Sequence, residues 1–376
     1  MKKIKVLHVT SCFQYGGTEA YIMNNFRAVD RSKYGFEFWI FKEDASPYRE
    51  EINQLGGKIY HGELPNIRKI FHFIRSLSVH IKSNGPYDVI HSHVNIMNGW
   101  VMLAAFYAGV KVRISHSHAT SGRSSTRIVK RSYYKMLEFM IKIFATKKLS
   151  CSIDAGNYLY GEKYFAKHGE VVNNGIDVNK FSNTKPSKIS KLIEKYNIHD
   201  NHIVIGNITR FDKNKNHDFI IDIFKEIQVI EPNSILVLGG IDGGLLTSIK
   251  DKVKNNKLSD SVRFIGARDD VEDWLHIING YLFPSLYEGL GIVLLEAQAA
   301  GVKCFASSSV STEVDLGLGL IEFIDLDASP KHWAKKIIAN LANTRIPSKV
   351  IQSTFDRRGY SISSSIRRLQ EIYKGE

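Results

Sequence analysis

Residues 281–301 read YLFPSLYEGLGIVLLEAQAAG. The first five residues are typical of a buried strand, the next four of a turn, and GIVLLEAQAA of an apolar helix. The turn and the helix carry two carboxylates, Glu288 and Glu296, with seven residues between them. An ionised carboxylate in apolar surroundings costs on the order of several kcal/mol unless a partner compensates it. We therefore expect a strand–turn–helix unit in which nearby groups pair with these glutamates.

The same alternation of β-rich runs and helical patterns continues on both sides of this segment. Strands that alternate with helices predict βαβ units and a mainly parallel sheet. In the first half the β-rich runs are KIKVLHVTS (3–11), FEFWIFK (36–42), KIYHG (58–62), YDVIHSH (87–93), KVRISHSH (111–118), KLSCSI (148–153) and EVVNNGID (170–177). In the second half they are HIVIGNITR (202–210), SILVLGG (234–240), SVRFIG (261–266), GYLFPS (280–285), VKCFASS (302–308) and LIEFIDL (320–326).

Polar FSNTKPSKISK (181–191) separates the two series and is predicted to be a linker. The predicted fold class is α/β, with two doubly wound Rossmann-like domains that face each other across a cleft. We assign residues 1–180 to the first domain and 181–356 to the second. A C-terminal amphipathic helix at about 357–376 is expected to pack back on the first. Ligands of such sheets bind at the carboxyl ends of the strands.

Composition limits the possible functions. The 376 residues suggest two domains, and 43% hydrophobic with 24% charged residues fits a soluble globular protein. The apolar run in MKKIKVLHVTSCF is too short for a signal peptide, and no run approaches the ~18 residues of a membrane span. Three cysteines without CxxC spacing favour reduced thiols and a cytoplasmic location. A net charge of +13 favours anionic partners: nucleic acid, an acidic membrane surface or phosphorylated small molecules.

Two segments have residues suited to phosphate. Gly16 and Gly17, in SCFQYGGTEAY (11–21), end a strand and open a helix, where backbone N–H groups can approach an anion. Arg210 and Lys215 follow a strand in GNITRFDKNKNHDF, and two such cations can hold a diphosphate. A tight turn without a ligand explains the glycines equally well, and a solvated basic loop remains an alternative for the cations.

The two glutamates of 281–301 fit a ligand with both hydroxyls and phosphates. Glu288 lies just before the helix, where a carboxylate gains about 0.3–1 kcal/mol from the helix dipole. Glu296 lies two turns along the same helix and reaches the cleft if the helix points at the ligand. The alternative, a helix cap and one paired helix carboxylate, explains Glu288 well and Glu296 poorly.

The segment FPSLYEGLGIVLLEAQAAG resembles the signature of retaining glycosyltransferases of family 4, which are two-Rossmann-domain enzymes of the GT-B type. The resemblance extends from about residue 4 to about residue 313, and it is strongest to members that build capsular or exopolysaccharide repeat units. The other segments that carry it are GGTEAYIMNNF (16–26), DVIHSH (88–93), RISHSHAT (113–120), VVNNGIDVNKF (171–181) and GNITRFDKNKNHD (206–218).

The resemblance implies a role for each matching residue. Glu288 would contact the donor sugar and stabilise positive charge, and Glu296 would bind the ribose hydroxyls. Arg210 and Lys215 would neutralise the leaving diphosphate. His118 matches the histidine that reaches the donor sugar, although His116 lies on the same strand face and the choice stays open. The backbone groups implied in cradling phosphates and sugar are those of Gly16, Gly17, Gly289, Leu290, Gly291 and Ile292.

The implied activity is retaining transfer of a hexose-type sugar from a nucleotide donor, most simply a UDP-sugar, to a lipid-linked saccharide. Cations and N–H groups can stabilise the departing diphosphate, so the prediction includes no cofactor and no metal. Asp325-Leu-Asp327 has the form of a metal-binding DxD motif but lies outside the donor segments. The pairs His91/His93 and His116/His118 each share a strand face, yet neither is followed by a third ligand at convincing spacing.

Residues 123–148 form a basic segment with eight Lys or Arg, one acidic residue and many apolar side chains. Such a helix can rest on an anionic membrane surface, which would suit a polyprenyl-diphosphate-linked acceptor at the inner face of the plasma membrane. An ordinary packed helix with a solvated basic face is the alternative.

Two other functions fit parts of the sequence. A nucleotide-sugar epimerase can use the same fold, but an acid/base set at the sugar C2 is not recognisable. A nucleic-acid-binding protein is suggested only by net charge, without a recognisable binding motif.

Overall fold

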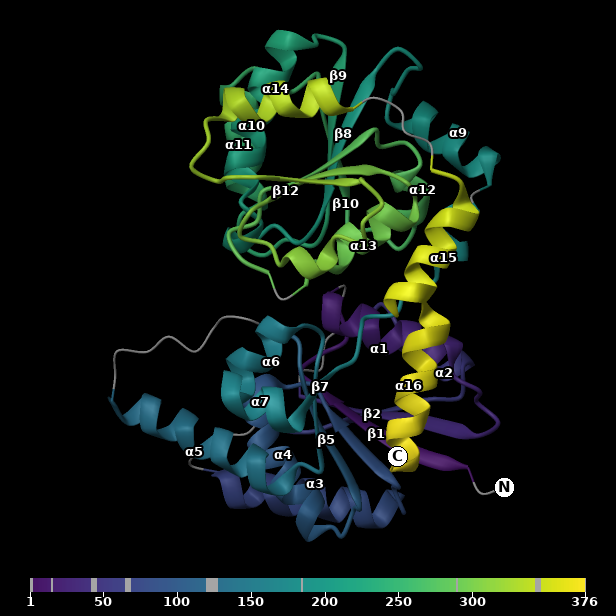
Figure 1. The fold of residues 1–376 in the computed structure, drawn as a ribbon, viewed down its shortest axis with the longest axis vertical. Helices are drawn as coiled ribbons and strands as arrows, with labels where there is room; N and C mark the ends of the chain where they lie inside the picture. The colour runs from purple at the N-terminus through teal and green to yellow at the C-terminus, as the bar shows by residue number, and fades with distance from the viewer. Residues whose placement is uncertain are drawn as a thin grey trace. The chain divides into compact units, whose positions relative to one another are not determined.

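The computed structural model describes residues 3–14, 16–41, 46–64, 69–119, 128–183, 185–288, 290–341 and 346–375. The chain divides into two compact units (Figure 1). The amino-terminal unit comprises residues 1–175 and 362–376, and the carboxyl-terminal unit comprises residues 176–361. The last helix, α16 (Ile362–Lys374), therefore belongs to the amino-terminal unit, where it packs beside α1 (Gly17–Ala28).

The amino-terminal unit contains a parallel sheet of seven strands in the order β3-β2-β1-β4-β5-β6-β7. The strands are β1 (Ile4–Thr10), β2 (Tyr34–Ile40), β3 (Lys58–His61), β4 (Val89–Ser92), β5 (Val112–Ser117), β6 (Lys147–Ser150) and β7 (Gly169–Val171). The other helices described here are α2 (Arg49–Gln54), α3 (Ile70–Asn84), η2 (Asn95–Met97), α4 (Asn98–Tyr107), α5 (Ile128–Phe144), α6 (Ile153–Tyr160) and α7 (Glu162–His168).

Both faces of this sheet are covered by helices. Successive residues of β1 point to opposite faces, so Leu7 and Val9 pack in one hydrophobic cluster with α3 and α4, while Val6 packs in a second with α1 and α16. Burial on both faces explains why the strands are apolar nearly throughout.

The carboxyl-terminal unit has six parallel strands in the order β10-β9-β8-β11-β12-β13. They are β8 (Ile203–Ile208), β9 (Ser234–Gly239), β10 (Val262–Gly266), β11 (Gly280–Phe283), β12 (Lys303–Ser307) and β13 (Ile321–Ile324). The helices described here are α8 (Val178–Ser182), α9 (Pro186–Lys195), η3 (Lys213–Lys215), α10 (His217–Ile230), α11 (Leu246–Asn255), α12 (Val271–Leu275), α13 (Ile292–Ala299), η4 (Thr312–Val314), α14 (Pro330–Asn340) and α15 (Ser348–Arg358).

The predicted fold class, two doubly wound Rossmann-like α/β units, is confirmed. The prediction of a linker at 181–191 is wrong, because these residues include the end of α8 and the first half of α9. Pro186 is the first residue of α9, a position where its missing N–H costs nothing. The polar composition marks a surface helix that buries Leu192, not an unstructured connection.

No disulfide bond joins Cys12, Cys151 or Cys304. Among the residues that the structure describes, none of the helices combines the length and the apolarity that crossing a bilayer requires.

Candidate active site

Each sheet has a point where the strand order reverses. In the amino-terminal sheet the reversal lies between β1 and β4, and in the carboxyl-terminal sheet it lies between β8 and β11. Loops at the carboxyl ends of such neighbouring strands diverge, and ligands of open α/β sheets bind there. The loops that follow β8 and β11 contain Arg210, Lys215 and Glu288. The fold therefore brings residues 210–215, 286–288 and 290–292 to one edge of one sheet.

Glu288 has a charged partner in Lys215. The Lys215 ammonium group donates to Oε1 of Glu288 and forms an ion pair with it. The same oxygen accepts hydrogen bonds from the Asn214 amide at 3.2 Å and the Ser285 hydroxyl at 3.0 Å. The Lys215 and Glu288 side chains are only 19% and 12% exposed, so solvent screens this pair less than a surface pair. Among the described residues, no hydrogen bond reaches the second oxygen, Oε2, which leaves it able to accept one from a ligand.

Two asparagines hold the two loops together. The Asn214 side chain donates to the Tyr287 carbonyl at 2.6 Å and accepts from the Tyr287 amide at 3.2 Å. The Asn216 amide donates to the Pro284 carbonyl at 3.1 Å. Asp212 accepts from the backbone N–H of Asn214 at 3.0 Å and so fixes the start of η3. These asparagines were not predicted as site residues, although the polar run DKNKN (212–216) between a strand and a helix was a visible signal.

Arg210 differs from Lys215 in its surroundings. Its side chain is exposed, and within the described part of the chain it forms no ion pair. A guanidinium at the carboxyl end of β8 that forms no ion pair with a described residue is suited to an anionic ligand. Lys215 is already engaged, so an anion would have to share it with Glu288.

The start of α13 supplies backbone N–H groups. The helix begins at Ile292, and Gly291 before it has a φ of 74°, a left-handed conformation that strains other residues. Leu290 is buried beside it. The N–H groups of the first turn of a helix lack intrahelical partners and can bind an anion. Gly289, the fourth residue predicted here, lies outside the described residues.

Glu296 lies in the middle of α13 and is partly buried. Burial raises the pKa of its carboxyl, the charge of Lys180 lowers it and nearby Glu272 raises it, and the net result is a pKa of about 7. The Lys180 ammonium is itself paired with Glu272 at 2.9 Å. Among the described residues, no hydrogen bond or ion pair reaches the Glu296 carboxylate. A ligand that brings hydroxyl donors would relieve this unfavourable environment.

The glycine turn of the amino-terminal unit opens α1. Gly16 is the N-cap residue and Gly17 is the first residue of the helix. A Cβ atom at Gly16 would collide with Oε2 of Glu19, so the glycine permits this carboxylate to lie beside the helix N-terminus. A carboxylate there is favoured by the helix dipole. An incoming phosphate at this helix end would have to displace it.

Asp325 and Asp327 follow β13, two strands away from β11 in the sheet. Oδ1 of Asp325 accepts the backbone N–H of Asp327 at 3.0 Å. This contact is typical of a turn stabilised by an Asp side chain.

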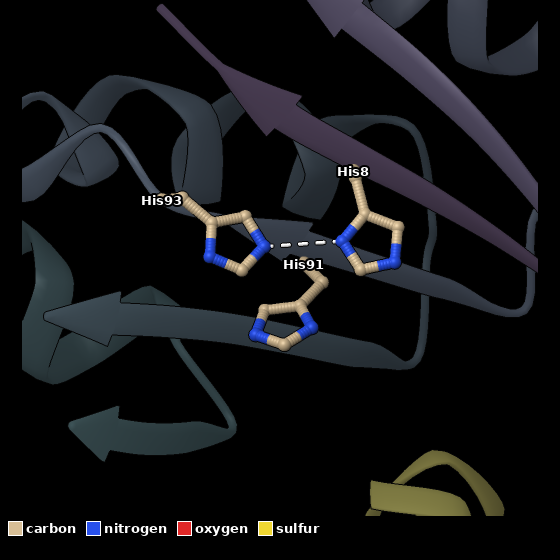
Figure 2. Close-up of side chains that lie close together, drawn as sticks. All are labelled: His8, His91 and His93. Atoms are coloured by element: carbon tan, nitrogen blue, oxygen red, sulfur yellow. Dashed lines mark hydrogen bonds between the residues drawn. The ribbon is translucent and has the colours of Figure 1, made fainter. Parts of the chain in front are cut away.

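Five histidines lie together at the carboxyl ends of β1, β4 and β5, and we call them the histidine cluster: His8, His91, His93, His116 and His118. Figure 2 shows His8, His91 and His93, with the contact between His8 and His93 dashed. The two i, i+2 pairs were recognised in the sequence, but His8 was not. His8 joins them because the parallel pairing of β1 with β4 sets it directly beside His91.

Hydrogen bonds link the cluster into two chains. In one, His8 Nδ1 contacts His93 Nε2 at 3.1 Å, and His93 Nδ1 contacts His118 Nε2 at 2.9 Å. In the other, His116 Nδ1 contacts His91 Nε2 at 3.0 Å, and His91 Nδ1 contacts the Tyr373 hydroxyl of α16 at 2.9 Å. Tyr373 comes from the last helix, so the end of the chain supports residues near its beginning.

Burial keeps these imidazoles neutral. It lowers the pKa of His8 and of His118 to about 3, and it lowers the pKa values of His91, His93 and His116 well below the usual value. A neutral imidazole can donate or accept a hydrogen bond, but it has no extra proton to give at pH 7. His116 is fully buried, whereas His118 is partly exposed and can contact a ligand without a rearrangement.

Comparison with known proteins identifies the family. Residues 15–180 match the family described as Glycosyltransferase Family 4, and residues 185–354 match the family described as Glycosyl transferases group 1. Neither the epimerase nor the nucleic-acid alternative is favoured by these matches.

Relatives match over nearly the whole chain. The glycosyltransferase EpsF of Bacillus subtilis is 32% identical over 98% of this chain and 96% of its own. The capsular polysaccharide biosynthesis glycosyltransferase CapH of Staphylococcus aureus is 28% identical over 98% of both chains. An Escherichia coli protein named UDP-Gal:alpha-D-GlcNAc-diphosphoundecaprenol alpha-1,3-galactosyltransferase is 23% identical over 99% of this chain and 97% of its own.

The fold recurs in solved structures. HepE of Anabaena, crystallised with UDP-glucose, superposes with a TM-score of 0.80 at 17% identity, covering 99% of this chain and all of that one. This likeness supports the two-unit fold of GT-B glycosyltransferases. With an identity of 32% to EpsF along almost its full length, the chain belongs to glycosyltransferase family 4 and is a glycosyltransferase of polysaccharide biosynthesis.

Proposed function

We propose that the protein transfers a hexose-type sugar from a UDP-sugar to a lipid-linked saccharide, with retention of anomeric configuration and without a metal ion. The observation that carries the proposal is the Lys215–Glu288 ion pair, which joins a cation to a carboxylate at the switch point of the carboxyl-terminal sheet. Transfer from a nucleotide sugar creates negative charge on the diphosphate and positive charge near the anomeric carbon, so it needs both groups close together.

The cations would bind the diphosphate. Arg210 has no ion-pair partner among the described residues, and Lys215 has hydrogen-bonding capacity beyond Glu288. The N–H groups at Leu290, Gly291 and Ile292 would add backbone donors for the phosphates or the sugar. As the Lys215 ammonium turns toward the phosphate, Glu288 loses part of its neutralisation. Its carboxylate then stabilises the positive charge that develops on the sugar ring.

The remaining roles concern the nucleoside and the sugar. Glu296, partly buried and without a described hydrogen bond, would accept the ribose hydroxyls. His118 would hydrogen-bond to the donor sugar, while His93 holds its Nε2. HepE was crystallised with UDP and with UDP-glucose, and the E. coli relative is named for UDP-Gal, which favours UDP as the nucleotide.

Retention follows most simply from a front-face route. The bond between the anomeric carbon and the diphosphate oxygen breaks while the acceptor hydroxyl forms its bond on the same face. The proton of that hydroxyl passes to the departing phosphate oxygen, and UDP leaves. This route needs no second protein base.

The acceptor side involves a surface of α4 and α5 that we call the aromatic-basic patch. Its exposed apolar members are Phe106, Tyr107, Met136, Phe139 and Ile143, and its exposed cations are Lys130, Arg131 and Lys135. The rings of Phe106 and Phe144 lie 5.2 Å apart and join the two helices. Aromatic side chains beside cations suit an anionic membrane surface. We propose that this patch holds the protein at the inner face of the plasma membrane, beside a polyprenyl-diphosphate-linked acceptor.

Turnover of a panel of UDP-sugars in the presence of EDTA tests the activity. We expect slow release of UDP from one UDP-hexose, faster release when a lipid-diphosphate-linked sugar is added, and a product with the anomeric configuration of the donor by NMR. An inverted product would overturn retention, and a requirement for a divalent ion would overturn metal independence.

Sedimentation with vesicles tests the membrane surface. The protein should bind vesicles rich in anionic lipid at low salt, and a variant with Lys130, Arg131 and Lys135 changed to Glu should bind at least about tenfold more weakly. A matched variant with Lys250, Lys254 and Lys257, which are exposed in or just after α11, changed to Glu should bind as the unchanged protein does. Equal binding by all three proteins would remove the patch from this role.

A further inference from the structure

Two groups of three histidines in the described chain have ring nitrogens close enough to share one ion. The first group is His8, His91 and His93, and the second is His93, His116 and His118. In each group, one ring nitrogen from each of the three histidines lies within 4.8 Å of the corresponding nitrogens of the other two. His93 belongs to both groups, so a single ion can occupy one of them.

The group with His116 and His118 is the better ligand set. In the first group, both ring nitrogens of His91 are already engaged, with Tyr373 and with His116. In the second group, Nε2 of His116 is fully buried, and no described residue forms a hydrogen bond with it. His118 is partly exposed and provides a route for an ion to enter. His116 and His118 are i, i+2 neighbours on one strand face, with ring centroids 4.1 Å apart. Their rings are nearly parallel, so the partly exposed His118 ring would turn to direct its lone pair at the same ion as His116.

The hydrogen bonds around this group fit the proton positions that metal binding requires. A histidine ligand gives the lone pair of one nitrogen to the metal and donates the N–H of the other to a supporting group. His116 can donate its Nδ1–H to His91 Nε2 and keep Nε2 for the ion. His93 can donate its Nε2–H to His8 Nδ1. Its Nδ1 contacts His118 Nε2 at 2.9 Å, and the ion would replace this hydrogen bond between two of its own ligands. His8 and His91 thus become the supporting groups.

We propose that His93, His116 and His118 form a binding site for a transition-metal ion of the Zn²⁺ type. Three imidazoles and one water complete a four-coordinate site. Imidazole favours Zn²⁺, Co²⁺, Ni²⁺ and Cu²⁺ over Mg²⁺ and Ca²⁺, which prefer oxygen ligands. The ion takes no part in the sugar transfer. Because the bound ion engages His118, we expect it to inhibit sugar transfer. This expected inhibition rests on the role proposed for His118 above, whereas the metal site itself does not.

Titration of the full-length protein, without a polyhistidine tag, with Co²⁺ tests the site without any nucleotide sugar. We expect saturation at one ion per chain, with the intense visible absorption of four-coordinate Co²⁺, and loss of that absorption when Zn²⁺ is added. His116→Gln and His118→Gln should each weaken binding by at least about tenfold, as should His91→Gln through its support of His116. His80→Gln, at a partly buried histidine in the same unit that is outside the cluster, should bind Co²⁺ unchanged.

Far-UV circular dichroism confirms that each variant is folded. If His116→Gln fails to fold, the partly exposed His118→Gln carries the test alone. Weak absorption typical of six-coordinate Co²⁺, or an affinity that neither variant lowers, would overturn the proposal. Failure of UDP-sugar turnover would leave the site standing, so the two proposals fail separately.

Discussion

The Lys215–Glu288 pair and the histidine cluster occupy equivalent positions, because each lies at the carboxyl end of strands that flank the switch point of its sheet. Their electrostatics differ. The pair holds full opposite charges in a partly exposed loop, whereas burial makes the imidazoles neutral. One region can therefore stabilise charges that form during transfer, and the other can provide directed but uncharged hydrogen bonds. The same sheet topology supports both regions, because the fold sets where the site lies and the side chains set which interactions it can make.

Glu288→Gln should have the largest effect. It removes the negative charge but keeps the size of the side chain, so we expect kcat to fall at least about 100-fold, roughly 2.7 kcal/mol, with little change in UDP affinity. Steady-state kinetics and calorimetric titration with UDP measure the two quantities. Glu194→Gln, at an exposed position on α9, is the matched control. If turnover and UDP binding fell equally, Glu288 would be a binding residue and the contrast would weaken.

Lys215→Ala should chiefly weaken donor binding. Hydrogen bonds to charged groups contribute about 1.5–3 kcal/mol, so the affinity for UDP should fall about 10- to 100-fold. Lys213→Ala changes an exposed lysine of the same 3-10 helix and should leave UDP affinity within about twofold. Calorimetry at one ionic strength compares the two. Equal losses in both variants would indicate a diffuse basic loop in place of a specific phosphate contact.

His118→Asn should have a smaller effect, because it removes one neutral hydrogen bond. We expect kcat/KM to fall about tenfold or less. The burial that lowers the pKa of His118 to about 3 keeps it neutral throughout the assay range, so the pH–rate profile between about pH 6 and 8 should have the same shape in both proteins. An inflection near pH 6.5 that disappears in the variant would show that His118 titrates, and the contrast between a charged and a neutral region would fail.

Glu296→Gln should have the smallest effect, on stability and its pH dependence. Burial raises the pKa of Glu296 from 4.5 to about 7, so the folded state binds a proton more tightly than the unfolded chain does. The free energy of unfolding therefore decreases as pH rises from about 4.5 to 7, by about 1–2 kcal/mol once partial exposure is allowed for. Urea unfolding at pH 5 and pH 8 should show a smaller loss of stability in Glu296→Gln. An identical loss in both proteins would mean that Glu296 is well solvated.

Much of the fold could be predicted because strand and helix patterns are local. Burial on both faces makes the strands continuous apolar runs, and the strand runs along the chain reappear as β1 to β13. The two helices at 178–195 were not predicted, because a polar segment is typical of a linker as well as of a surface helix. A short surface helix needs only a few buried residues, and α9 buries Leu192 alone.

The site could be predicted only in part. The apolar surroundings of Glu288 and Glu296 indicated that both carboxylates need partners. The sequence could not show that the partner of Glu288 is Lys215, more than seventy residues earlier in the chain. It also could not show that no described residue forms a hydrogen bond or ion pair with the Glu296 carboxylate. His8 carries no motif, and it joins the cluster because β1 pairs with β4.

The sequence by itself determined the alternating elements, the family resemblance and the residue types available for binding an anionic sugar donor, since these depend on neighbours along the chain. Only the tertiary structure decided which carboxylate forms an ion pair, which histidines are hydrogen-bonded to one another and which histidines are buried. Those properties depend on groups that become neighbours when parallel strands align and exclude water, and local sequence does not record that arrangement.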